Sequence, residues 1–543
     1  MANGFFQTPI PRNEPVLSYG PGSPEKKEVK QKLAELKSQK IEIPLIIGGE
    51  EVQSGNPGEC RCPHQHGHVL ATYQQAESQE VEQAIQAAQD AWPKWAAMSW
   101  EARAAIFLKA ADLLAGPFRA TLNAATMLGQ GKTIFQAEID SACELIDFYR
   151  FNPYYMQQIY QQQPESARGC WNYLEQRPLE GFIFAVTPFN FTSIAGNLPT
   201  SPAMMGNTVV WKPASSAVYS AYFVMKLLQA AGLPDGVINF VPGSGGKVGT
   251  PALNSPELAG VHFTGSTAVF QGMWRTIGTN IQQYKSYPRI VGETGGKDFI
   301  FVHNSANMDE TITAAIRGAF EYSGQKCSAA SRIYLPESMW AEFETQALAM
   351  LKRLKMGDPE DFRNFTGPVI DRAAFTSITE YIEFAKASAE AEIVAGAKYD
   401  DSKGYFIEPT IVKTGNPHFK LIEEEIFGPV LTIYTYPDSD YEATLYLCNR
   451  TSPYALTGAI MATERAAIEL ARDILRHAAG NFYINDKPTG AVVGQQPFGG
   501  GRASGTNDKA GSMINLQRWI SPRTIKETFV PPTDFIYPHM DEK

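Results

Sequence analysis

The sequence predicts an α/β protein built around a doubly wound parallel sheet. Short apolar runs at residues 182–186, 208–211, 237–241 and 261–263 alternate with helical segments. Each run has the length of one buried strand, and each ends in a loop rich in Gly, Pro, Ser, Thr or Lys. This alternation is the βαβ rhythm of a parallel sheet. Because such sheets bind ligands beyond the carboxyl ends of their strands, we expect function in these loops.

Composition narrows the class of protein. The 543 residues suffice for about three to four domain-sized units, and 44% apolar with 19% charged residues is typical of a globular chain. A net charge of −10 argues against a general nucleic-acid binder. We expect no membrane span, because no apolar run approaches ~20 residues. Six sparse cysteines suit a reducing compartment. We expect a cytoplasmic protein; the alternative is a mitochondrial matrix protein lacking its transit peptide.

The first 164 residues carry three predicted regions. Residues 1–40 form an extended arm ending in a short helix over 25–37, and residues 41–47 and 69–73 are strands of a small hairpin layer. Residues 80–159 have helical periodicity, with a stop at Gly116-Pro117 and a break at Pro153. The polar, aromatic segment that follows, 165–176, is predicted as an exposed hairpin.

A metal site is a second possibility within this region. Cys60, Cys62, His64, His66 and His68 alternate along the chain, so a strand would place them on one face. Pro63 and Gly67 favour a polar turn instead, and no second ligand pair with zinc spacing follows. We therefore predict no metal.

The strand-end loops of the first sheet contain the candidate ligand-binding residues. They are Thr187 to Asn190, Lys212 to Ser215, Gly243 to Gly249, and Thr264 to Thr267. The last loop opens a helix whose N-terminus can hold pyrophosphate. No GxGxxG fingerprint is present, and each loop also has a plain structural interpretation: Asn190 as a helix cap, Lys212 as a solvated charge.

Cys327 is the candidate nucleophile. It follows a Gly-Gln-Lys turn after a helix predicted over 308–322 and precedes a strand at 332–335. Such a turn can expose the sulfur and aim backbone N–H groups at the atom it attacks. A buried structural cysteine is the alternative. Glu293 lies upstream in a glycine-rich loop before a strand at 298–302. Helices are expected near 340–354 and 373–389, and Glu425 follows them.

Taken together and in this order, these segments resemble aldehyde dehydrogenases. The segments are TPFNFT at 187, GQKCSA at 324, FYINDK at 482, GQQPFGG at 494 and RASGTNDK at 502. The last three resemble the branch that oxidises L-glutamate γ-semialdehyde, formed from 1-pyrroline-5-carboxylate in proline catabolism, to L-glutamate. Another aldehyde substrate and a catalytically inactive relative are the rival interpretations; the presence of Asn190, Glu293 and Cys327 argues against the second.

The resemblance implies a division of the chain. It predicts a Rossmann-like NAD-binding domain over 41–164 and 180–296, and an α/β catalytic domain over 297–510. Residues 165–179 and 511–543 would form a small oligomerisation β-element, with a C-terminal strand around 514–525. A homodimer or higher homo-oligomer follows from the same resemblance.

The resemblance also assigns roles. Cys327 would add to the aldehyde carbon, the Asn190 side chain and the Cys327 N–H would hold the alkoxide, and Glu293 would deprotonate the hydrolytic water. The NAD contacts would be Thr187, Lys212, Gly265, Ser266, Thr267, Ala268, Val269, Glu425 and Phe427. Ser215 stands where many relatives carry a carboxylate that repels a 2′-phosphate, which leaves exclusion of NADP open. The substrate contacts would be Ser328, Gly490, Ala491, Phe191 and Phe498.

Overall fold

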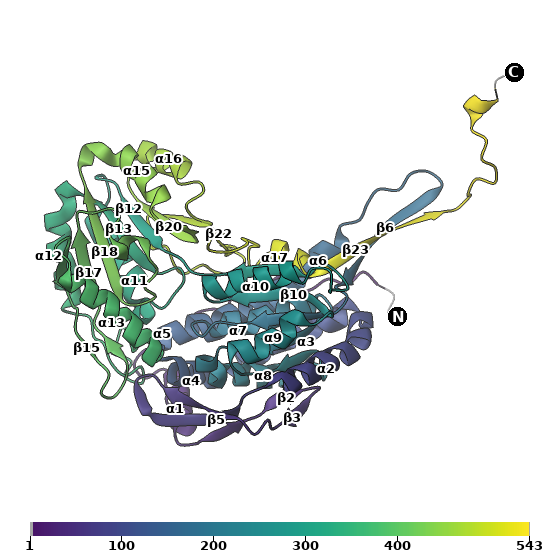
Figure 1. The fold of residues 1–543 in the computed structure, drawn as a ribbon, viewed down its shortest axis with the longest axis horizontal. Coiled ribbons are helices and arrows are strands. Elements are labelled where there is room, and N and C mark those ends of the chain that lie inside the picture. The colour runs from purple at the N-terminus through teal and green to yellow at the C-terminus, as the bar shows by residue number, and fades with distance from the viewer. Residues whose placement is uncertain (1–3, 542–543) are drawn as a thin grey trace.

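Two seven-stranded sheets, each flanked by helices, account for most of residues 4–541, the part of the chain that this computed structural model describes (Figure 1). The predicted α/β class with largely parallel sheets is confirmed. A two-stranded ribbon and the C-terminal tail project away from both sheets. No helix in the described range is long and apolar enough to cross a membrane.

The first sheet has the strand order β11-β10-β7-β8-β9-β2-β3. Its strands are β2 (Leu45–Ile47), β3 (Glu50–Val52), β7 (Phe182–Val186), β8 (Thr208–Lys212), β9 (Ile238–Phe240), β10 (Leu258–Thr264) and β11 (Arg289–Glu293). The register places Val186 beside Lys212 and Thr264 beside Glu293. Because β7, β8, β10 and β11 run parallel, the predicted ligand loops meet at one edge of the sheet.

Alternating side chains give this sheet two apolar faces. Phe182 and Phe184 pack with α2 (Ser78–Ala97), α9 (Gly245–Asn254) and α10 (Thr267–Thr279). Ile183 and Ala185 belong to the cluster on the opposite face. That cluster includes α3 (Trp100–Ala115), α4 (Arg119–Gln130), α6 (Leu145–Gln161), α7 (Thr192–Met204) and α8 (Val218–Ala231). Burial on both faces explains why these strands read as continuous apolar runs.

The second sheet has the order β14-β17-β18-β13-β12-β20-β21, and only β14 runs antiparallel to its neighbour. Its strands are β12 (Asp298–Val302), β13 (Ala330–Pro336), β14 (Ala391–Ala395), β17 (Thr410–Thr414), β18 (Val430–Tyr436), β20 (Thr457–Met461) and β21 (Asn481–Ile484). Its helices are α11 (Met308–Phe320), α12 (Trp340–Leu351), α13 (Arg372–Ala387), α15 (Tyr441–Arg450) and α16 (Arg465–Ile474). The helices predicted near 340–354 and 373–389 are thus confirmed.

The N-terminal region differs from the prediction in one respect. The helix α1 (Pro24–Lys37) is present, capped by the Ser23 hydroxyl, which accepts from the Lys26 N–H. The single strand predicted at 41–47 is interrupted at Pro44: β1 (Ile41–Ile43) pairs parallel with β5 (Gln65–Gln74), and β2 joins the first sheet. The hairpin here is instead β4 (Pro57–Cys62) with β5. Proline has no N–H to continue a ladder, which accounts for the switch of sheet.

The break predicted at Pro153 is wrong, because α6 continues through it to Gln161. An interior proline costs a helix about 3 kcal/mol. Buried side chains on both sides of it, including Phe148 and Met156, give the packing that offsets this cost. A π-helix over Glu138–Glu144 leads into α6.

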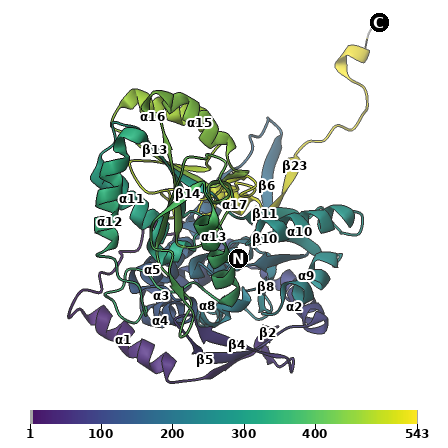
Figure 2. The ribbon, with the colours of Figure 1, turned by 60° about the vertical axis from the view of Figure 1, so that its left-hand side comes forward.

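The hairpin predicted at 165–176 is also wrong. This segment contains one strand, β6 (Cys170–Pro178), which pairs antiparallel with β23 (Ile520–Thr528) from Pro178↔Ile520 to Cys170↔Thr528. The short helix α17 (Met513–Gln517) precedes β23, so the C-terminal strand begins later than the predicted 514. The ribbon stands clear of both sheets in two views 60° apart (Figures 1 and 2).

Candidate active site

A cavity of about 1020 Å³ opens at the carboxyl edge of the first sheet. It extends to Cys327, in the turn that precedes strand β13 of the second sheet. Each sheet with its helices forms one unit, the first and the second in chain order. Nine of the predicted site residues line the cavity: Thr187, Asn190, Lys212, Gly265, Ser266, Val269, Cys327, Glu425 and Phe427. Ser215 lines it as well. The other two predicted cofactor contacts, Thr267 and Ala268, are the first residues of α10 and are not among the residues that line the cavity. The Thr267 hydroxyl lies 3.2 Å from that of Tyr454.

The first-sheet side of the cavity suits a dinucleotide. The 13-residue helix α10 begins there, and its N-terminal N–H groups carry partial positive charge. A Cβ added at Gly245, Gly246 or Gly249 would meet no atom within 4 Å, so these glycines leave open space where they line the cavity. The cavity volume and these donors fit a bound dinucleotide.

Lys212 and Arg275 are cationic residues of this wall, and Lys212 is the buried one. The Lys212 Nζ donates to the Pro213 carbonyl at 3.1 Å. Burial lowers the pKa of Lys212 to about 8, because the charged form loses its hydration. The Ser215 hydroxyl donates weakly, at 3.4 Å, to the Gly243 carbonyl. No carboxylate stands at that position to repel a 2′-phosphate.

Glu425 and Phe427 complete the wall from the second unit. The Glu425 Oε1 accepts from the Gly296 N–H at 2.8 Å, and burial raises the pKa of Glu425 to about 7. Phe427 has a left-handed φ of 57° and meets the Phe189 ring edge-on, at 5.8 Å between centroids. A carboxylate in this position can accept from ribose hydroxyls.

The turn that carries the nucleophile is left-handed. Helix α11 ends at Phe320, two residues before the predicted end, and Tyr322, Ser323 and Gly324 have φ of 51°, 53° and 67°. Each left-handed non-glycine residue costs roughly 1–2 kcal/mol. The Ser323 N–H donates to the Thr366 hydroxyl at 3.1 Å, and its Oγ donates to the Gly367 carbonyl at 2.6 Å. These partners offset the backbone cost and fix the turn.

Cys327 follows this turn, with 8% of its surface exposed. It lines the cavity from a buried position. Burial raises the pKa of the Cys327 thiol above its usual range, and the nearby carboxyls of Asp298, Glu425 and Glu293 raise it further. A positive charge bound nearby would favour the thiolate.

Asn190 lines the same cavity as Cys327 and carries an amide donor. Its Nδ2 donates to the Gln325 carbonyl at 3.1 Å, which leaves the second N–H available to the cavity that it lines. Gln325 is itself fixed, since its Oε1 accepts from the Ile370 N–H at 2.8 Å. The Gln325 carbonyl thus orients the Asn190 amide, the predicted oxyanion donor, and the Ile370 backbone N–H holds the Gln325 side chain.

Glu293 ends β11 and is not among the residues that line the cavity. Its Oε2 accepts from the Gly500 N–H at 2.9 Å, and burial raises the pKa of Glu293 well above its usual range. The charge interaction between Glu293 and Cys327 indicates that the two groups are close. A buried carboxyl with a raised pKa is suited to general base work near neutral pH.

The predicted substrate residues lie outside the cavity lining. The Ser328 hydroxyl is 2.8 Å from that of Thr489, which places Ser328 against the loop of Gly490 and Ala491. The Phe191 ring lies beneath the Lys132 ammonium, 4.2 Å from ring centroid to Nζ. Phe498 exchanges two backbone hydrogen bonds with Ala510.

Sequence reasoning missed a buried polar network behind Phe191. The Lys132 Nζ donates to Asp140 at 2.6 Å, and Asp140 accepts from the N–H groups of Thr192 and Ser193. Glu144 accepts from the Ser193 hydroxyl at 2.8 Å, and burial raises the pKa of Glu144 to about 8. Charged residues interrupting the apolar periodicity of 132–147 were the available signal.

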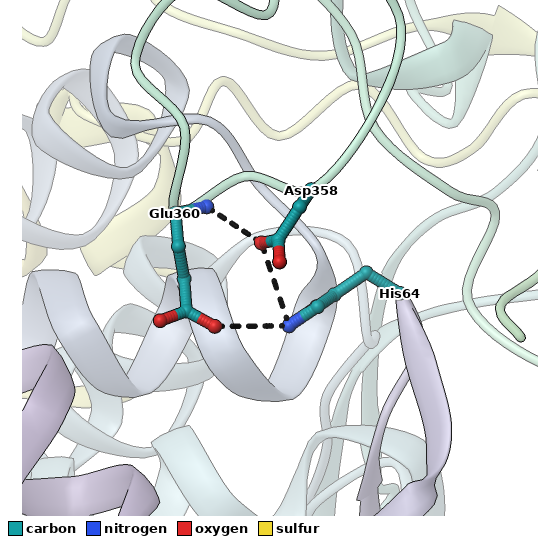
Figure 3. Close-up of side chains that lie close together, drawn as sticks. All are labelled: His64, Asp358 and Glu360. Atoms are coloured by element: carbon teal, nitrogen blue, oxygen red, sulfur yellow. Dashed lines mark hydrogen bonds and ion pairs between the residues drawn. The ribbon is translucent and has the colours of Figure 1, made fainter.

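The metal alternative reduces to one histidine. Among the described residues, only His64 of the 60–68 segment joins a group of three potential ligands, with Asp358 and Glu360 (Figure 3). The His64 Nε2 lies 3.4 Å from the Glu360 Oε1 and 3.7 Å from the Asp358 Oδ1. Lys37 already pairs with that Glu360 oxygen, and the Glu360 N–H donates to the Asp358 oxygen at 2.9 Å. The cluster fastens α1 and the β4–β5 turn to the 358–360 loop.

Comparison with known proteins places this site in a family. Residues 51–525 match the aldehyde dehydrogenase family. The chain is 54% identical to Δ1-pyrroline-5-carboxylate dehydrogenase, mitochondrial, of Dictyostelium discoideum over 98% of this chain and 96% of that protein. The enzyme of the same name from Agaricus bisporus is 52% identical, over 98% of both chains.

Solved structures give the same result. The crystal structure of the Mycobacterium tuberculosis Δ-pyrroline-5-carboxylate dehydrogenase is 52% identical and covers 100% of both chains, with a TM-score of 0.96. A second structure of that enzyme, bound with NAD, superimposes equally well. The chain belongs to the aldehyde dehydrogenase family.

Proposed function

We propose that the chain oxidises L-glutamate γ-semialdehyde, derived from 1-pyrroline-5-carboxylate, to L-glutamate with NAD, the second step of proline catabolism. The single observation that carries the proposal is the placement of Cys327. It lines a dinucleotide-sized cavity together with Asn190, and the next residue, Ser328, meets the Thr489 hydroxyl. Relatives that bear this activity in their names cover nearly the whole chain.

Addition to the aldehyde is the first step. Cys327 releases its thiol proton to water, the sulfur bonds to the carbonyl carbon, and the electron pair of the C=O bond moves to oxygen. The free N–H of Asn190 and the backbone N–H of Cys327 hold that oxygen in the thiohemiacetal. Losing one such donor typically costs about 3 kcal/mol of barrier.

When bound, NAD would supply the oxidising chemistry, as the acceptor of the hydride that leaves the Cys327-bound carbon. Lys212, Glu425 and the α10 N-terminus, with Gly265 and Ser266, would hold it, and Thr187, Thr267, Ala268, Val269 and Phe427 would complete its contacts. The oxidised carbon remains bound to Cys327 as a thioester. Glu293 takes a proton from water, whose oxygen bonds to the thioester carbon. The C–S bond then breaks, the acid leaves, and the proton passes from Glu293 to the Cys327 sulfur. The first-sheet unit thus binds the cofactor, and the second unit supplies the nucleophile.

Recognition of the substrate needs an anchor for its α-carboxylate at a fixed distance from Cys327. The Ser328 hydroxyl and the backbone N–H groups at Gly490 and Ala491 are the proposed donors. Hydrogen bonds to a charged group contribute about 1.5–3 kcal/mol each. Phe191 and Phe498 would flank the aliphatic stem.

A steady-state assay tests the proposal. Purified protein is given 1-pyrroline-5-carboxylate, succinic semialdehyde, propanal and benzaldehyde, each with NAD and with NADP. We expect the highest kcat/KM for 1-pyrroline-5-carboxylate with NAD. A simple aldehyde preferred over it by tenfold would assign the chain another aldehyde substrate, and absence of turnover with all four would favour an inactive relative.

Assembly and compartment belong to the same proposal. The tail beyond β23 exposes Phe529, Val530, Phe535, Ile536, Tyr537 and Met540. Such a stretch, next to a two-stranded ribbon, supports a homo-oligomer formed through residues 165–179 and 511–543, which light scattering would measure.

The cytoplasm is our proposed compartment. The mitochondrial matrix is the alternative, supported by relatives named as mitochondrial, and fractionation distinguishes the two.

A further inference from the structure

Asn13, in the N-terminal arm, joins helix α6 to the loop of residues 489–496. Its Nδ2 donates to the Asp147 carboxylate and to the Val493 carbonyl, both at 2.8 Å. Its Oδ1 accepts from the Gln495 Nε2 at 2.9 Å. One side chain therefore uses both its donor and its acceptor end to tie together segments about 480 residues apart in the chain.

The arm that presents Asn13 is itself firmly fixed. The Glu14 N–H donates to Asp147 at 2.7 Å, and the Glu14 carboxylate pairs with Arg119 and Arg150. Further along, the Tyr19 hydroxyl donates to Glu138 at 2.7 Å. Because these anchors are part-buried or buried, Asn13 is held at a defined place and can position what it contacts.

The loop 489–496 needs such support, since it contains no helix or strand. Gly490 and Gly494 have φ of 102° and 80°, and a Cβ at Gly494 would lie 2.2 Å from the Phe151 ring. At its start, Thr489 meets the Ser328 hydroxyl. The loop is thus held at the Ser328 end, against α6, and at the arm, where Asn13 makes the contact.

We propose that Asn13 is a positioning residue for substrate selectivity: it holds the loop 489–496 in the place where its backbone N–H groups meet the substrate carboxylate. This inference rests on the proposed function, which puts the carboxylate at Gly490 and Ala491. Backbone donors hold an anion well only if they are fixed before it arrives, because ordering a loop on binding reduces affinity. The effect belongs to binding of the acidic aldehyde and not to the chemistry at Cys327.

Asn13→Ala tests the inference in the full-length protein. We expect KM for glutamate semialdehyde to rise about 3- to 10-fold, with the KM for NAD and the turnover of propanal unchanged. The inhibition constant of L-glutamate against the semialdehyde should rise by the same factor. Gln495→Ala, which removes the exposed loop side of the contact, should reproduce part of the increase.

The matched control is Thr8→Ala. Thr8 also joins the arm to α6. Its N–H and its hydroxyl both donate to the Gln157 Oε1, at 2.6 and 3.0 Å, and neither bond involves the loop. The substitution removes the hydroxyl bond. An unchanged KM in this variant, with a raised KM in Asn13→Ala, supports the inference. Equal changes in both variants, or equal changes for both aldehydes in Asn13→Ala, would overturn it in favour of a general stabilising role. If Asn13→Ala does not fold, Gln495→Ala alone decides by the same readouts.

Ser328→Ala separates this failure from that of the proposed function. A selective KM increase in Ser328→Ala with none in Asn13→Ala would reject the arm and keep the carboxylate anchor. No selective increase in either variant would reject the anchor, and the positioning role with it.

Discussion

The two ends of the active-site cavity are built differently. The cofactor end is open space lined by glycines, hydroxyls and a helix N-terminus. Among the described residues, the Lys212 Nζ donates one hydrogen bond, to the Pro213 carbonyl. At the nucleophile end, the turn at Tyr322 to Gly324 is left-handed, and the Ser323 N–H and hydroxyl donate to Thr366 and Gly367. The first end accommodates a ligand by leaving room, and the second holds atoms in place at a conformational cost.

The contrast indicates where substitutions act. Open walls tolerate side-chain changes and alter affinity, because the ligand supplies most of the contacts. A fixed turn converts small shifts into lost chemistry, because a near-attack geometry depends on about an ångström. The substitutions below test this difference, from the largest expected effect to the smallest.

Cys327→Ala should reduce turnover by at least about 10³-fold, because no other group supplies the sulfur. NAD affinity should change less than twofold, since the cofactor wall is elsewhere. Stopped-flow measurement of NADH and titration of cofactor fluorescence check the two parts. Retention of a tenth of the activity would remove Cys327 from its role.

Glu293→Gln should lower steady-state turnover about 10²–10⁴-fold. A single burst of NADH near one per active site should remain, because hydride transfer precedes the hydrolysis that needs the base. Rapid mixing at high enzyme concentration measures the burst. A variant with no burst would place Glu293 before hydride transfer.

Ser328→Ala should raise KM for glutamate semialdehyde about 10-fold, by loss of one hydrogen bond to a carboxylate, and leave propanal unchanged. Ala491→Ser should lower the same KM severalfold by adding a hydroxyl to the loop. Steady-state kinetics with both aldehydes provides the comparison. Parallel changes for the two substrates would disprove the carboxylate anchor.

Lys212 should make NAD binding depend on pH. Its pKa is lowered to about 8, so the ammonium is present below that pH and is lost as the pH rises through it. The dinucleotide is an anion, so its Kd should rise severalfold between pH 7 and 9. Lys212→Met should show the weaker affinity at all pH values. A pH-dependent Kd in that variant would assign the titration to another group.

Ser215→Asp should have the smallest effect, confined to one ligand. A carboxylate there would repel a 2′-phosphate, raising KM for NADP severalfold while NAD changes less than twofold. The ratio of the two kcat/KM values measures it. An unchanged ratio would show that residue 215 does not face the ribose.

Local signals predicted much of this molecule. The predicted alternation of strands and helical segments is observed, and α8 ends at Ala231 because Gly232, with φ of 93°, provides a left-handed C-cap. The strand-end loops converge as expected, since parallel register dictates it. Asn190 and Lys212 both line the cavity for that reason, and Cys327 reaches it from the second sheet.

The errors share a cause, which is tertiary packing that no local pattern encodes. Pro153 stays helical because of buried neighbours, and Tyr322 and Ser323 adopt a conformation that their own preferences disfavour. The contact of Asn13 with Val493 joins opposite ends of the chain. Spacing arguments cannot find a partner so distant.

The pairing of β6 with β23 also sets an order of events during synthesis. The nine residues of β6 are made about 350 residues before their partner, and the Asn207 side chain, in the first unit, donates to the Trp519 carbonyl at 2.9 Å. Long-range pairs of this kind form late, after the segments between them have collapsed. Until the C-terminus leaves the ribosome, β6 therefore exposes an unpaired strand edge, which makes the nascent chain prone to aggregate and dependent on chaperones.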